Sequence, residues 1–135
     1  MLQFYFLSIV SNLVAGTALC AEALARRLRS FEAISTALSS RKGKLSTGLA
    51  ALLVGVGTLF VPASGLLVLG DLLPAMTGMT MGIALLFEVF RQDALFPSDP
   101  PGSRDRPFFS YRATLGALGI AAAVIHFFLP ERPFL

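Results

Sequence analysis

The sequence predicts an all-α integral membrane protein, a bundle of four transmembrane helices that forms one membrane domain over residues 1–135. Of the 135 residues, 55% are hydrophobic and only 14% are charged, whereas soluble domains carry about 25% charged residues. The mean hydropathy is +0.74. Four apolar stretches are long enough to approach the roughly 20 residues that one membrane crossing needs. Together they nearly fill the chain, so we expect no extramembrane domain.

The first expected span covers residues 2–25. Its apolar stretch closes with Glu22 and Arg26. Residues 21–23 have the small-x-small pattern of a cleavage site, but a signal peptide begins with positive charge and the first basic residue here is Arg26. We therefore expect a span that is not cleaved. The single cysteine, Cys20, cannot form an internal disulfide.

Basic residues concentrate in the segment that follows, residues 26–44, where Glu32 is the only acid. Its apolar residues recur at helical spacing (Leu28, Phe31, Ile34 and Leu38). That pattern is typical of a short amphipathic interfacial helix, lying on the membrane surface after the first span. Clusters of basic residues beside a span attract anionic lipid headgroups. We therefore expect contact with lipid headgroups or a partner from Arg26, Arg27, Arg29, Arg41, Lys42 and Lys44.

Three further spans are expected, at residues 45–61, 72–90 and 108–129. Pro62 ends the second span and Pro130 the fourth, because proline cannot continue a helix. Asp71 is a suitable N-cap for the third span. Between the third and fourth spans, residues 91–107 are too polar to cross a membrane and too rich in proline to be helical.

The distribution of basic residues predicts the orientation. Ten of the eleven Lys and Arg residues lie in the loops 26–44 and 91–107 or at the start of the fourth span, and Arg132 is the exception. Loops rich in Lys and Arg stay in the cytoplasm. We therefore expect both loops in the cytoplasm and both termini outside. A helical bundle also indicates a plasma membrane, the inner membrane in a bacterium, because outer-membrane proteins are β-barrels.

A weak internal repeat is present. Residues 12–22 align with 78–88, and residues 48–62 align with 116–130, at offsets of 66 and 68. The matches include Gly16 with Gly82, Glu22 with Glu88, Gly48 with Gly116, and Pro62 with Pro130. Such matches fit a parallel duplication of a two-helix hairpin. They also fit chance in a composition this biased.

Small residues form stripes on the expected spans. In lipid, helices associate where small residues let their backbones approach closely. The candidate packing residues are Gly78, Gly82, Gly116, Gly119, Gly48 and Gly55.

Polar groups inside a membrane are costly, so they are candidates for function. A polar path would run near Asn12, Asp71 and His126. Asn12 lies mid-span, while Asp71 and His126 are expected at the outer side. The structural interpretation of each residue is a hydrogen bond between helices or, for Asp71, a helix cap.

Two acids lie at equivalent cytoplasmic ends of the first and third spans. Glu22 precedes Arg26 by four residues, and Glu88 precedes Arg91 by three. These spacings allow ion pairs along one helix. We expect two interfacial pairs, Glu22–Arg26 and Glu88–Arg91, with a cation site as the alternative.

No catalytic motif, metal-ligand cluster or phosphate-binding loop is present in the sequence. We expect no cofactor, no metal and no nucleic-acid partner. The leading hypothesis is a small non-enzymatic integral membrane protein, a structural or accessory subunit of a larger complex. Its partners would be anionic lipid and other membrane subunits or copies of itself. The alternative is a small oligomeric transporter or channel, and a third reading is catalysis on a lipid.

Overall fold

A computed structural model describes residues 2–60, 72–93 and 111–128. Within these ranges the chain is entirely helical, with five α-helices, one 3-10 helix and no strand. The elements are α1 (Leu2–Arg27), η1 (Arg29–Phe31), α2 (Glu32–Ser39), α3 (Arg41–Phe60), α4 (Leu72–Asp93) and α6 (Arg112–Phe128). The expected helix cap Asp71 and the helix-ending Pro62 and Pro130 lie outside the described residues.

Three of these helices are long and apolar enough to cross a membrane. They are α1, α3 and α4, while α6 is a shorter apolar helix of 17 residues. The all-helical prediction and its membrane-compatible character are therefore confirmed for the described residues. The fourth span was expected over residues 108–129, and α6 covers residues 112–128 of it.

The second expected span begins earlier in the structure than at residue 45. Helix α3 starts at Arg41, because Ser40 adopts an extended conformation (φ −62°, ψ 152°) and its hydroxyl accepts a hydrogen bond from Gly43 N at 3.0 Å. This is the geometry of a serine N-cap. The first turns of α3 therefore include basic residues that the sequence placed in a loop.

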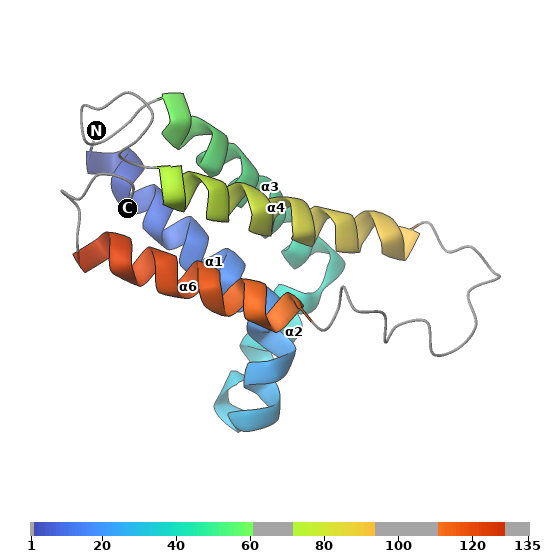
Figure 1. Cartoon of the computed structure of the whole chain (residues 1–135). Helices are drawn as coiled ribbons and strands as arrows, with labels where there is room; N and C mark the ends of the chain where they lie inside the picture. The colour runs from blue at the N-terminus through green and yellow to red at the C-terminus, as the bar shows by residue number, and fades with distance from the viewer. Residues whose placement is uncertain (1, 61–71, 94–110, 129–135) are drawn as a thin grey trace.

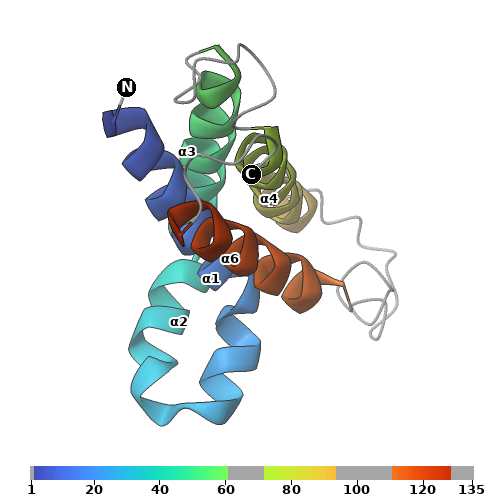
Figure 2. The ribbon, with the colours of Figure 1, turned by 60° about the vertical axis from the view of Figure 1, so that its left-hand side comes forward.

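The short helix after α1 is present, and it folds back onto the bundle. Figure 2 shows α2 beside the C-terminal turns of α1. The Ser35 hydroxyl donates a hydrogen bond to the Ala21 carbonyl at 3.1 Å, and Leu38 packs against the hydrophobic core. Two of the apolar residues expected on the segment 26–44 are exposed, namely Leu28, which precedes η1, and Ile34 of α2. The apolar residues of this segment thus divide between the core and the surface.

The four long helices alternate in direction. Figure 1 shows α1 starting at the end of the molecule where α3 ends, α4 begins and α6 ends. The closest neighbours are α3 with α4 and α1 with α6. At the opposite end lie the last turns of α1 and α4 and the first turns of α3 and α6.

The distribution of side chains is the reverse of that in a soluble bundle. The core is built mainly from small residues, including Ala15, Ala18, Ala51, Ala75 and Ala123. Large apolar side chains point outward, as Leu53, Phe90 and Phe128 do with 63%, 66% and 72% of their surface exposed. Soluble proteins bury such residues. A bundle surrounded by hydrocarbon has no reason to bury them and packs through small residues instead.

Two glycine contacts set the distance between neighbouring helices. A Cβ on Gly116 would lie 2.6 Å from the Gly16 carbonyl oxygen, and one on Gly82 would lie 2.8 Å from the Gly48 carbonyl oxygen. Both distances are shorter than real Cβ contacts allow. The α1–α6 and α3–α4 pairs therefore approach at positions where only glycine fits.

Candidate functional site

A chain of four charged side chains crosses the bundle near one end, one from each long helix. Lys44 Nζ of α3 lies 2.9 Å from Glu88 Oε2 of α4, and Glu88 Oε1 lies 3.0 Å from Arg112 Nε of α6. Arg112 Nη1 continues the chain to Glu22 Oε1 of α1 at 2.9 Å. A further hydrogen bond joins Arg112 Nη2 to the Ala18 carbonyl at 3.3 Å. We call these four residues the ion chain.

Three members of the ion chain are buried. The exposed fractions of their side chains are 6% for Lys44, 3% for Glu88 and 9% for Arg112, against 60% for Glu22. Removing one partner from a buried pair costs about 3–5 kcal/mol, since the remaining charge stays desolvated. The ion chain therefore ties α3, α4 and α6 together at this end, while its contact with α1 runs through the exposed carboxylate of Glu22.

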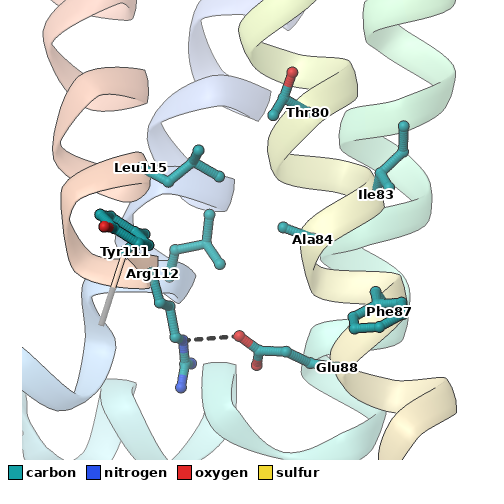
Figure 3. Close-up of a pocket in the computed structure, with 9 residues that line it drawn as sticks. Thr80, Ile83, Ala84, Phe87, Glu88, Tyr111, Arg112 and Leu115 are labelled. Carbon is teal, nitrogen blue, oxygen red and sulfur yellow. Dashed lines mark ion pairs between the residues drawn. The ribbon is translucent and has the colours of Figure 1, made fainter. Parts of the chain in front are cut away.

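A cavity of about 350 Å³ lies between α4 and α6, next to the ion chain. Its walls are mainly apolar, and Leu19 of α1 reaches it as well. Figure 3 shows Glu88 and Arg112 facing each other across one end of it. The remaining lining residues are Thr80, Ile83, Ala84, Phe87, Tyr111 and Leu115. An apolar cavity with a few charged groups at one end is a common form of ligand site.

Asn12 forms a contact between α1 and the start of α4. Its side-chain amide donates a hydrogen bond to the Pro74 carbonyl at 2.9 Å. A Cβ on Gly78 would lie 2.7 Å from Asn12 Oδ1, so the missing side chain of Gly78 makes room for the amide. Asn12 is buried by this packing.

His126, in the last turn of α6, is buried against α1 at the end of the bundle away from the ion chain. Its ring packs against Tyr5, with ring centroids 4.9 Å apart. The Tyr5 hydroxyl donates to the carbonyl oxygens of His126 at 2.9 Å and Phe127 at 3.2 Å. This is a direct polar link between the first turns of α1 and the last turn of α6.

The three residues of the expected polar path occupy different places. Asn12 contacts α4, His126 contacts Tyr5 of α1, and Asp71 lies outside the described residues. Along α1, Tyr5 and Asn12 are separated by about 10 Å of helix rise. The path itself stays a prediction.

The ion partners of the two acids come from distant parts of the chain. The expected pairs Glu22–Arg26 and Glu88–Arg91 stay predictions, whereas the pairs described above join Glu22 to Arg112 and Glu88 to Lys44 and Arg112. Sequence reasoning did not single out Arg112. One signal could have found it, because the offset of 68 that aligns Gly48 with Gly116 also aligns Lys44 with Arg112.

The basic residues expected at lipid headgroups differ in exposure. Arg26, Arg27, Arg29, Arg41 and Lys42 are exposed. Lys44 is a correction, because it is buried against Glu88 inside the bundle. It faces inward because α3 has already begun at Arg41, which places Lys44 on the same buried side of that helix as Gly48 and Ala51.

The six candidate packing glycines are all buried. They are Gly48, Gly55, Gly78, Gly82, Gly116 and Gly119.

Residues 1–126 match the model of an uncharacterised protein family, and the chain belongs to that family. No curated protein and no solved structure matches the chain.

Proposed function

We propose that this member of an uncharacterised family is a non-enzymatic integral membrane protein that acts as a structural or accessory subunit of a larger membrane complex. The observation that carries the proposal is the reversed distribution of side chains. Small and polar residues fill the interior, and large apolar side chains cover the outside. Such a surface suits contact with hydrocarbon and with other membrane helices.

The ion chain supports a role as a rigid unit. It connects α3, α4 and α6 through buried groups that are expensive to separate, and it reaches α1 through the exposed Glu22. Asn12 and the Tyr5–His126 contact add polar links between helices elsewhere in the bundle. Polar groups used for helix contacts favour a scaffold over a conducting path through a single chain. Transport by an oligomer remains the alternative function.

We further propose that the bundle is a parallel duplication of a two-helix hairpin, related by an approximate two-fold axis. The support comes from contacts. If Gly16 is equivalent to Gly82 and Gly48 to Gly116, the contact of Gly16 with Gly116 corresponds to that of Gly82 with Gly48. Both contacts are present, each with a glycine on either side.

The charged groups follow the same relation. Glu22 is equivalent to Glu88, and Lys44 to Arg112. The ion pair of Glu22 with Arg112 therefore corresponds to the pair of Glu88 with Lys44, and each distance is 2.9 Å. Two independent sets of contacts thus obey the offsets of 66 and 68. This agreement of contacts supports a duplication over chance identity in a biased composition.

The proposed location is a plasma membrane, with both termini outside. The ion chain lies at the end where the exposed basic residues of α1, η1 and α3 gather. By the positive-inside rule this end faces the cytoplasm, where anionic headgroups would meet those residues.

Native mass spectrometry of the protein, extracted from its own membranes in a mild detergent, tests the proposed role. We expect reproducible complexes with other membrane proteins at fixed stoichiometry. Extraction with alkaline carbonate, which should leave the protein in the membrane, is the control for integral insertion. A homo-oligomer without other subunits, together with solute flux in liposomes, would contradict the accessory role and favour the transporter.

A further inference from the structure

The cavity between α4 and α6 has an apolar body and a charged end. Leu19, Ala84 and Leu115 form part of its walls, while Glu88 and Arg112 close one end. Its rim carries the exposed side chains of Ile83, Phe87 and Tyr111. Because these rim residues lie on the outer side of the bundle, the cavity opens sideways, toward the surrounding lipid in a membrane-embedded protein.

The charge at the closed end is unbalanced among the buried groups. Lys44, Glu88 and Arg112 are all buried, and they carry two positive charges and one negative charge. The balancing acid, Glu22, is 60% exposed. Exposed ion pairs contribute little stability. An anionic group entering the cavity could therefore compete with Glu22 for the Arg112 guanidinium.

In the first half of the chain, the position that corresponds to this cavity lies between α1 and α3, and α2 covers it. By the offsets of the proposed duplication, the rim residues Phe87 and Tyr111 correspond to Ala21 and Gly43. There α2 lies over both positions: Ser35 binds the Ala21 carbonyl, and a Cβ on Gly43 would lie 3.1 Å from the Leu38 carbonyl oxygen. An amphipathic element with a polar contact and an apolar side chain thus fills the related gap.

We propose that the cavity between α4 and α6 binds one acyl chain of an anionic membrane lipid, whose acidic headgroup pairs with Arg112. The volume of about 350 Å³ is at the lower end of the range for ligand pockets, which suits one chain. The apolar walls take the chain, and the net positive charge of the buried groups selects the acidic headgroup. This inference rests on the proposed membrane location.

The absence of tryptophan from the sequence permits a direct test. Phe87→Trp places a single fluorophore at the cavity rim, and Phe90→Trp places one about a turn further along α4, on a residue that does not line the cavity. Each variant is reconstituted in phosphatidylcholine bilayers with increasing phosphatidylglycerol that carries brominated chains. Bromine quenches tryptophan fluorescence on contact, so the quenching curve gives the relative association constant of the acidic lipid.

At Phe87→Trp we expect a preference for the acidic lipid about fivefold greater than at Phe90→Trp, the effect of one basic side chain close to an anionic headgroup. Equal preferences at the two positions would overturn the proposed site. Absence of quenching at both positions would overturn the membrane location as well, so the two failures are distinguishable.

Two charge variants, made in the Phe87→Trp background, identify the headgroup contact. Arg112→Gln should reduce the preference to the value at Phe90→Trp. Glu22→Gln should increase it, because the acidic lipid then has no competitor for Arg112 Nη1. Because Glu22 is exposed, we expect Glu22→Gln to keep the fold. This variant therefore tests the headgroup contact even if Arg112→Gln does not fold. A preference that Glu22→Gln leaves unchanged or lowers would contradict the proposal.

Discussion

Glu88 Oε2 lies 2.9 Å from Lys44 Nζ in the interior of the bundle, and only 3% of the Glu88 side chain is exposed. Its other oxygen lies 3.0 Å from Arg112 Nε. One carboxylate thus receives two buried cations from two different helices. The arrangement makes Glu88 the central acid of the ion chain and predicts a large difference between the two glutamates.

Glu88→Gln should destabilise the folded protein by about 3–5 kcal/mol, because Lys44 and Arg112 then lose their common buried counter-charge. Glu22→Gln should cost about 0–1 kcal/mol, because its carboxylate is mostly exposed. Unfolding by sodium dodecyl sulfate in mixed micelles measures both. Equal losses in the two variants would show that burial does not control the strength of the ion chain.

Gly82→Ala should destabilise the bundle by about 1–3 kcal/mol, the usual effect of overpacking a tight contact. The added methyl group would meet the Gly48 carbonyl oxygen at 2.8 Å. Gly57→Ala is the matched control, since its nearest neighbour would be Phe4 Cε1 at 3.8 Å. This control should be neutral or more stable by up to about 1 kcal/mol, because alanine favours helix. A destabilisation of the same size at both glycines would argue against the close α3–α4 contact.

Asn12→Ala should lower stability by about 0.6–1.7 kcal/mol, between the average and the maximum found for hydrogen bonds between helices in membranes. The lost bond is the one to the Pro74 carbonyl. Ser46→Ala on the exposed face of α3 serves as the control and should change stability little. The same mixed-micelle unfolding measures both variants, and an unchanged midpoint for Asn12→Ala would mean that this contact does not hold α1 to α4.

Labelling with a membrane-impermeant maleimide tests the proposed orientation. In a Cys20→Ala background, Gln3→Cys should react in intact cells, because the N-terminus is expected outside. Ser30→Cys, on the exposed 3-10 helix η1, should react only after permeabilisation. The Cys20→Ala protein without an added cysteine is the negative control, and the unmodified protein, whose Cys20 is buried, should also stay unlabelled. Reaction of Ser30→Cys in intact cells, with protection of Gln3→Cys, would reverse the orientation.

The sequence by itself determined the all-helical, apolar character of the chain and the positions of most helices. Composition and local periodicity carry that information, and α1 and α4 follow the expected spans 2–25 and 72–90 to within a few residues. The sequence also predicted which small residues lie in the interior, because stripes of glycine and alanine mark close helix contacts. The start of α3 was missed, since it depends on the cap that Ser40 provides.

Only the tertiary structure decided which charges meet. Spacing along one helix suggests pairs three or four residues apart, yet Glu22 and Arg112 are 90 residues apart in sequence. Their contact depends on how α1 and α6 turn toward each other, which is set by the glycine contacts between them. The burial of Lys44, the return of α2 onto α1 and the cavity beside Glu88 have the same origin. Each arises where separate helices pack, and a local sequence pattern does not contain that geometry.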